Sequence, residues 1–145
     1  MSDDVPSPAE FLEACVCIGL NRAARATTRR YDATFREAGL TSGQFSLLAA
    51  LNRESPVPLS RLADLLCMDR TTLNRNVRLL EEGGLVASFA DPDDARVRAL
   101  GLTAKGLQML RAALPLWRQA QRESEALLEG KGWDAIKQRL NALSG

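Results

Sequence analysis

The chain has 145 residues, 46% of them hydrophobic, which is enough for one compact core, so we expect a single domain over residues 1–145. The formal net charge is only +1, which excludes the general basicity of a histone-like DNA binder. There is no histidine and the three cysteines lack the spacing of a zinc site, so the sequence predicts no metal site, no cofactor and no catalytic residue.

The N-terminal part of the chain predicts two helices. A long helix is expected over residues 8–38, because Pro8 suits an opening turn. Thr41 and Gln44 have the spacing of a capping box, which predicts a second helix through residue 51. The acidic start lacks a secretory signal and no apolar run could span a bilayer, so we expect a cytoplasmic protein without a membrane partner.

Residues 60–82 predict two short amphipathic helices joined by a tight polar turn. The second helix is expected over residues 70–82, with Asp69 as its N-cap and Gly83 and Gly84 as its stop. Its apolar residues recur with a period of 3.6, as Leu73, Val77 and Leu80. Its opposite face carries side chains that can contact DNA bases or phosphates, namely Thr71, Asn74, Arg75 and Arg78. For an isolated helix, a solvated polar face is the alternative interpretation.

The next segment predicts a β-hairpin. Residues 85–89 and 98–102 are expected to form two short strands around an acidic loop. In this loop Asp94 is placed to orient Arg96, and a held arginine can enter a narrow minor groove. A charged tip that only keeps the protein soluble is the alternative. The fold predicted is mainly α with a small β-hairpin wing, that is, a winged helix-turn-helix flanked by terminal helices.

After Thr103, a long helix is expected towards Glu129, and an amphipathic helix over residues 133–143. The terminal helices carry more apolar side chains than one chain can bury: Phe11, Leu12, Leu114, Trp117, Leu127, Leu128, Trp133, Ile136 and Leu140. Helical arms from two protomers would bury them together, so we expect a homodimer. A self-contained helical cap is the alternative.

The central half of the chain resembles the MarR family of transcriptional regulators (multiple antibiotic resistance regulators). The matching residues occur in the family's order: Leu40-Thr41 with Gln44, Leu62-Ala63, Asp69-Arg70-Thr71-Thr72, Leu80-Glu81 with Gly84-Leu85, Asp91-Pro92, Asp94, Arg96, and Leu102-Thr103 with Gly106. In some relatives, a very short strand before the helix-turn-helix joins the wing.

The resemblance implies a homodimer that binds a pseudo-palindromic double-stranded DNA operator and regulates transcription, as a repressor in our interpretation. It implies a DNA-binding lobe over residues 39–103 and a helical dimerisation lobe formed by residues 1–38 and 104–145. The residues that we expect to contact DNA, or to orient those that do, are Ser60, Thr71, Thr72, Asn74, Arg75, Arg78, Asp94, Arg96 and Arg98.

Two positions depart from the family pattern. Many relatives have basic residues just before the Asp-Pro of the wing, whereas this chain has Ser88, Phe89 and Ala90. Cys67 replaces a common glycine and would be strained if its φ were positive.

The signal that controls DNA binding has two candidates. Family members often bind aromatic acids between the two lobes, and Arg22, Arg25 and Trp117 are the candidate ligand residues. Hydroperoxide-sensing relatives instead use a cysteine in the first helix whose thiolate is bonded by tyrosines. Cys17 and Tyr31 have a similar separation, although the second tyrosine is replaced here by Ser42. Cys15 and Cys17 would point about 200° apart on one helix and could not join there.

Two other classes of function stay open. A winged helix can serve as a protein-interaction module that does not bind DNA. A thiol-based peroxidase with Cys17 as its nucleophile is a weaker alternative, because no general base or resolving cysteine is evident.

Overall fold

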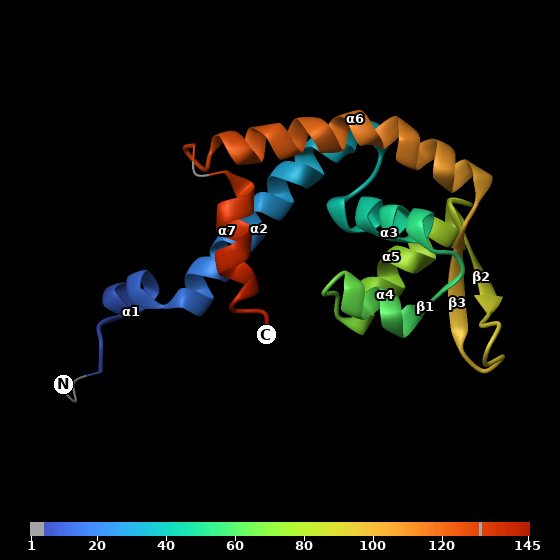
Figure 1. The fold of residues 1–145 in the computed structure, drawn as a ribbon, viewed down its shortest axis with the longest axis horizontal. Helices are drawn as coiled ribbons and strands as arrows, with labels where there is room; N and C mark the ends of the chain where they lie inside the picture. The colour runs from blue at the N-terminus through green and yellow to red at the C-terminus, as the bar shows by residue number, and fades with distance from the viewer. Residues whose placement is uncertain (1–4, 131) are drawn as a thin grey trace.

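The computed structural model describes residues 5–130 and 132–145. It is mainly helical with one small antiparallel sheet, which confirms the predicted fold class. Figure 1 shows α3, α4, α5 and the sheet gathered at one end, α1 and α7 at the other, and α2 and α6 extending between them. The elements in chain order are α1 (Pro8–Ala14), α2 (Val16–Phe35), the 3-10 turn η1 (Arg36–Ala38), α3 (Ser42–Arg53), β1 (Val57–Pro58), α4 (Leu59–Leu65), α5 (Arg70–Glu82), β2 (Val86–Ala90), β3 (Arg98–Leu102), α6 (Ala104–Ala126) and α7 (Trp133–Asn141).

The N-terminal helix is interrupted at Cys15, so the prediction of one continuous helix over residues 8–38 is wrong. α1 has its own capping box, in which the Ser7 hydroxyl accepts from the Glu10 N–H and the Glu10 carboxylate accepts from the Ser7 N–H. Cys15 then has extended backbone angles (φ −74°, ψ 111°) and gives α2 no side-chain cap. No residue of α1 is buried, so packing within the chain does not hold α1 in line with α2.

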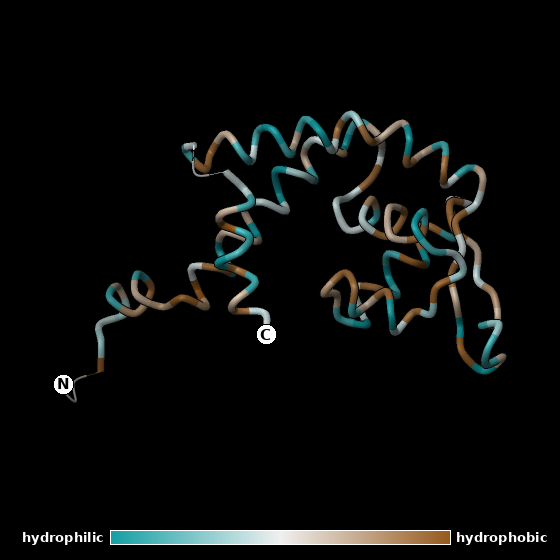
Figure 2. The backbone as a smooth tube through the Cα atoms, in the orientation of Figure 1, coloured by the Kyte–Doolittle hydropathy of each residue, from teal (hydrophilic) through white to brown (hydrophobic). Residues whose placement is uncertain are grey.

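The hydrophobic core lies in the part that carries the wing. Phe35, at the end of α2, stacks on Phe45 of α3 with ring centroids 4.6 Å apart. Other fully buried side chains are Leu47, Leu48, Leu51, Val57, Leu62, Leu73, Val77 and Leu100. Figure 2 shows hydrophilic and hydrophobic residues alternating along α6, as expected for a helix with one buried face.

The terminal helices bury much less. Neither α1 nor α7 has a buried residue. Large hydrophobic side chains are therefore exposed on these helices and beside them: Phe11, Leu12, Val16, Leu20, Leu127, Trp133 and Leu143. This part of one chain has an apolar surface without a partner within the same chain.

The sheet has the strand order β1-β3-β2, and both pairs are antiparallel. Val86 pairs with Leu102 and Ala90 with Arg98, so the first wing strand lies one residue later than predicted. The short strand β1 pairs with β3 through Val57 and Leu100, as some relatives led us to expect.

The start of α6 packs closely against the base of the wing. A Cβ added at Gly106 would lie 2.0 Å from the carbonyl oxygen of Leu85, so only glycine fits at this position. Thr103 caps α6 by accepting from the Gly106 N–H, and its hydroxyl donates to the Gly84 carbonyl at 2.7 Å. The Lys105 ammonium group donates to the Gly83 carbonyl at 2.7 Å. α6 is thus hydrogen-bonded to the residues that end α5.

The C-terminal helices are slightly shorter than predicted. α6 continues through Pro115 and ends at Ala126 rather than near Glu129, and α7 ends at Asn141 rather than at residue 143. Within residues 5–130 and 132–145, no helix is long and apolar enough to cross a membrane. The same residues contain no group of three potential metal ligands.

Candidate nucleic-acid interface

The local sequence at both ends of α5 defines this helix. The Asp69 carboxylate accepts from the Thr72 N–H at 2.8 Å and from the Thr72 hydroxyl at 2.7 Å. The hydrogen bonds from Thr72 hold the pKa of Asp69 below its usual value. At the other end, Gly84 has a φ of +70° and the Leu85 N–H donates to the Leu80 carbonyl, as in a Schellman motif. The Thr72 hydroxyl is therefore already used in capping the helix.

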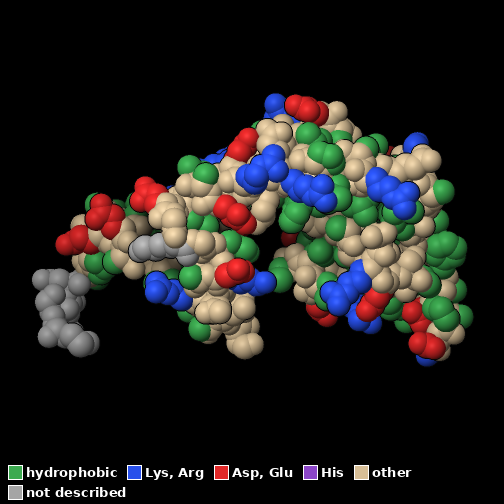
Figure 3. Space-filling view, turned by 45° about the horizontal axis from the view of Figure 1, so that its top comes forward, with side chains coloured by type: hydrophobic (Ala, Val, Ile, Leu, Met, Phe, Trp, Pro, Cys, Tyr) green, Lys and Arg blue, Asp and Glu red, His purple; other side chains and the backbone are tan. Residues whose placement is uncertain are grey.

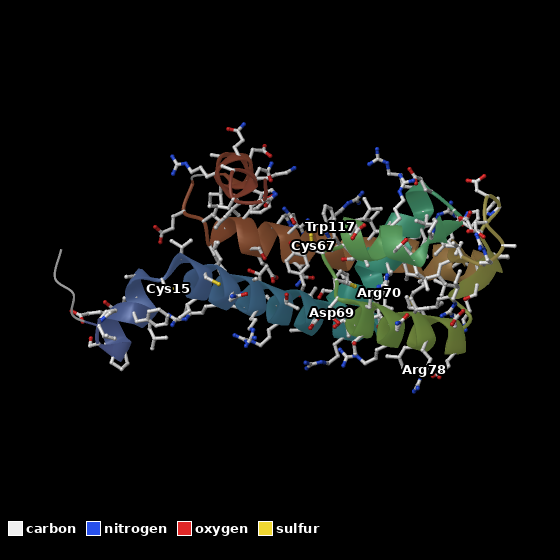
Figure 4. The ribbon with its side chains drawn as sticks, turned by 90° about the horizontal axis from the view of Figure 1, so that it is seen from below. Cys15, Cys67, Asp69, Arg70, Arg78 and Trp117 are labelled. Atoms are coloured by element: carbon white, nitrogen blue, oxygen red, sulfur yellow. The ribbon has the colours of Figure 1, made fainter. Side chains whose placement is uncertain are left out.

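The exposed face of α5 carries the polar side chains that the sequence analysis selected. Thr71, Asn74, Arg75 and Arg78 are exposed, whereas Leu73, Val77 and Leu80 are buried. The Arg78 side chain points away from the protein in Figure 4 and pairs with Glu82 at 3.1 Å. Among the described residues, Arg75 forms no salt bridge, so its guanidinium can take a new partner.

The tip of the wing holds one arginine in a fixed position. Asp91 accepts from the backbone N–H groups of Asp93 and Asp94, which closes the loop. The two carboxylate oxygens of Asp94 bind Arg96 through Nε at 3.1 Å and Nη2 at 3.2 Å. These hydrogen bonds lower the pKa of Asp94. The Arg96 side chain is 90% exposed and remains available to a partner.

Arg98 differs from the other candidate arginines because it binds two residues on two other elements, α5 and β2. Its Nη2 donates to Glu81 at 2.6 Å and its Nε donates to Ser88 at 2.9 Å. The sequence predicts Arg98 as a DNA-binding residue but does not indicate these partners, since Glu81 and Arg98 are 17 residues apart.

A groove of about 310 Å³ lies between α4, α5 and the wing. Ser60 and Asn74 line this groove, as does Arg70, which is not among the residues predicted to contact DNA. Arg70 is the first residue of α5, so its positive charge lies beside the helix N-terminus, and both favour an anionic partner. Charge elsewhere is mixed: Figure 3 shows basic and acidic side chains interspersed over the visible face. Any attraction for phosphates must therefore come from local geometry.

A larger cavity of about 750 Å³ is lined by residues of α2, α3, α4 and α6. Trp117, one of the candidate ligand residues, lines this cavity, but Arg22 and Arg25 line other hollows along α2. The arginines of this cavity are Arg53 and Arg61, and Arg61 pairs with Glu54 at 3.0 Å. Arg53 is not indicated by the sequence, because four helices must pack before the cavity exists.

The redox candidates do not meet within one chain. Cys17 and Tyr31 are fourteen residues apart on α2, which is about 21 Å at 1.5 Å per residue. The Tyr31 hydroxyl donates to Gln121 at 2.6 Å, and Cys17 accepts from Asn21 at 3.4 Å. Burial raises the pKa of Tyr31, which favours its neutral form. Because Cys15 lies at a helix break, the 200° argument against joining Cys15 to Cys17 does not apply.

Comparison with known proteins places this geometry among transcriptional regulators. A family model described as the MarR family matches residues 40–97. The crystal structure of the Mycobacterium tuberculosis transcriptional regulator MosR in complex with DNA has 38% sequence identity and a TM-score of 0.78. The structural match covers 89% of this chain and 92% of the MosR chain.

Two further relatives were found by sequence. An uncharacterised helix-turn-helix regulator of Bacillus subtilis, YxaD, is 34% identical over 53% of this chain, and the chain spans only 54% of that protein. The transcriptional repressor NicR of Pseudomonas putida is 32% identical over 66% of this chain and 63% of its own length. These relatives are named as regulators of transcription and not as enzymes.

Proposed function

Because the chain belongs to the MarR family of transcriptional regulators, we propose that it is a sequence-specific DNA-binding repressor that acts as a homodimer. The observation that carries the proposal is the pairing of two exposed features on one winged helix-turn-helix. One is the polar face of α5 and the other is Arg96, held by Asp94 at the tip of the wing. In a DNA complex, the polar face of α5 would lie in the major groove and Arg96 would enter the adjacent minor groove.

The residues of α5 have different roles in this proposal. Asn74 and Arg75 are exposed and read base edges, because amide and guanidinium groups can form bidentate contacts with adenine and guanine. Ser60, Thr71 and Arg78 position the helix on phosphates. Thr72 contributes indirectly through the cap, since its hydroxyl already donates to Asp69.

Dimerisation is supported by the exposed apolar side chains of the terminal helices, such as Phe11, Leu12 and Trp133. A two-fold axis would present the same surface on both chains and double the number of DNA contacts. Equilibrium sedimentation should give about 32 kDa, twice the 15.8 kDa of the chain. The two recognition helices should then lie one DNA turn apart, or ~34 Å.

The central experiment is selection of genomic DNA fragments by the purified protein, followed by affinity measurements on the selected sequence. We expect a pseudo-palindrome, and we expect Arg75→Ala to cost about 1–3 kcal/mol of binding free energy and to relax specificity. Unchanged affinity in that variant would remove Arg75 from base readout. Salt-insensitive binding to a protein, without DNA affinity, would favour the interaction-module alternative.

The cavity of about 750 Å³ beside Trp117 supports an aromatic acid as the effector. Its apolar walls include Phe45 and Trp117, and Arg53 forms no salt bridge among the described residues, so its guanidinium can bind a carboxylate. An aromatic acid should release wild-type protein from DNA, whereas Arg53→Ala should bind DNA but respond only at higher concentration. Arg22→Ala is the matched control, because Arg22 does not line this cavity.

A further inference from the structure

We propose that Glu81, Ser88 and Arg98 form a link that sets the position of the wing relative to the recognition helix. Arg98 is then a positioning residue and not a phosphate contact. The inference rests on the proposed function, because it concerns how the two DNA-binding features are held together.

The link is a closed set of contacts between three elements. Arg98, the first residue of β3, donates to Glu81 of α5 at 2.6 Å and to Ser88 of β2 at 2.9 Å. The Ser88 hydroxyl donates to the other carboxylate oxygen of Glu81. Both strands of the wing are thereby bound to the last turn of α5 by charge-assisted hydrogen bonds.

The pair between Glu81 and Arg98 is also the least exposed salt bridge among the described residues. Its side chains are 28% and 46% exposed, whereas those of Glu82 and Arg78 are 60% and 76% exposed. Salt bridges in a partly desolvated position hold their geometry better than fully hydrated surface pairs. The hydrogen bond from Ser88, together with Arg98, lowers the pKa of Glu81.

The place of the link explains why it would matter for DNA. Ala90 and Arg98 form the last strand pair before the tip, and Arg96 lies two residues beyond it. The direction in which the hairpin leaves α5 therefore sets where Arg96 meets the minor groove. Without the link, that direction would depend on the base of the wing alone.

The link includes a residue at which the chain departs from the family pattern. Basic residues common before the Asp-Pro of the wing are replaced here by Ser88, Phe89 and Ala90. Arg98 extends from the neighbouring strand, on the same face of the hairpin as Ser88, and supplies a basic group beside Glu81. The small Ser88 side chain leaves room for this guanidinium.

The test compares Glu81→Gln and Arg98→Gln with the control Glu82→Gln, which removes the same charge from the adjacent, more exposed carboxylate. Hydroxyl-radical footprinting on the selected operator reports the minor-groove contacts of the wing separately from protection in the half-site centre. We expect Glu81→Gln and Arg98→Gln to lose flanking protection and to bind about five- to tenfold more weakly. Glu82→Gln should keep the footprint and bind equally or more tightly, because a negative charge near phosphates is removed.

Two further measurements keep the proposal falsifiable. The double variant Glu81→Gln/Arg98→Gln should be no weaker than the weaker single variant, because both changes break one link. If Arg98→Gln alone weakens binding and also reduces the salt dependence, Arg98 contacts phosphate and the proposal is overturned. Loss of folded protein would weaken DNA protection equally at every position, whereas a displaced wing would weaken only the protection that flanks each half-site.

Amide hydrogen exchange in the free protein tests the link without DNA. Exchange of the β2 and β3 amides should be faster in Glu81→Gln and Arg98→Gln than in Glu82→Gln. Equal exchange in all three variants would overturn the link. If the wild-type protein selects no DNA sequence, the proposed function fails, while the exchange result still decides whether the link restrains the wing.

Discussion

Replacing Gly106 by alanine should destabilise the protein, although helix propensity alone predicts the opposite. Alanine in a helix is favoured over glycine by about 1 kcal/mol. At Gly106, however, the new Cβ would lie 2.0 Å from the Leu85 carbonyl oxygen and 2.8 Å from Cδ1 of Leu102. Backbone atoms must move by about 1 Å to restore ordinary contact, and overpacking of this kind costs about 1–3 kcal/mol.

The same movement disturbs the hydrogen bonds at the start of α6. The Thr103 N–H donates to Leu85 at 3.1 Å and the Thr103 hydroxyl donates to Gly84 at 2.7 Å. Each bond contributes about 1 kcal/mol net, so losing both brings the total to about 3–5 kcal/mol, before the gain in propensity is subtracted. The expected net loss of about 2–4 kcal/mol is a large part of the stability of an ordinary domain.

Urea unfolding at fixed protein concentration measures this change, since dimerisation would otherwise shift the midpoint. Gly83→Ala is the matched control, because a Cβ there meets its nearest atom at an ordinary 3.4 Å. We expect that control to be neutral or stabilising by up to about 1 kcal/mol. A Gly106→Ala protein as stable as wild type would refute the close packing of α6 on the wing.

Arg96→Ala should weaken operator binding and remove minor-groove protection beside each half-site, and Asp94→Ala should do so less, because it frees the arginine without removing it; footprints identical to wild type would contradict this. The folded-state pKa of Glu81 is lowered, so its contribution to stability is complete above its unfolded pKa near 4.5 and is lost as pH falls through the folded value. Between pH 7 and 3, the free energy of unfolding should therefore fall less for Glu81→Gln than for the wild type. Cys67 has a φ of +49°, so Cys67→Gly should raise the free energy of unfolding by about 0.5–1 kcal/mol, and a loss of stability would argue against strain there. If an aromatic acid is the inducer, Cys17→Ser should respond to it as wild type does, whereas peroxide release of wild type that this change abolishes would establish thiol control instead.

Much of the winged part could be predicted because its signals are local. Asp69, the double glycine and the apolar period of α5 lie within sixteen residues, and the matching helix was found with its predicted bounds. The ion pair of Asp94 with Arg96 is also local, with one residue between them. Local hydrogen bonds and periodicity are the features that a single sequence displays directly.

The remaining features depend on contacts between segments that are distant in sequence, or they have no local sequence signal. No glycine or proline lies among residues 9–18, so the sequence near Cys15 does not indicate the helix break. The partners of Arg98 come from α5 and β2, and the walls of the cavity at Trp117 come from four helices. Such sites appear only once the tertiary fold brings these segments together.

The hydrogen bonds between α6 and the residues that end α5 make α6 a lever arm attached to the recognition helix. Its 23 residues extend about 34 Å at 1.5 Å per residue, from the wing to the exposed apolar surface near α7. A tilt of about 5° at the far end would displace the near end by about 3 Å, close to the ~3.4 Å rise between base pairs. If the chain binds DNA as proposed, substitutions around Ala126 should therefore change operator choice although they lie far from the recognition helix.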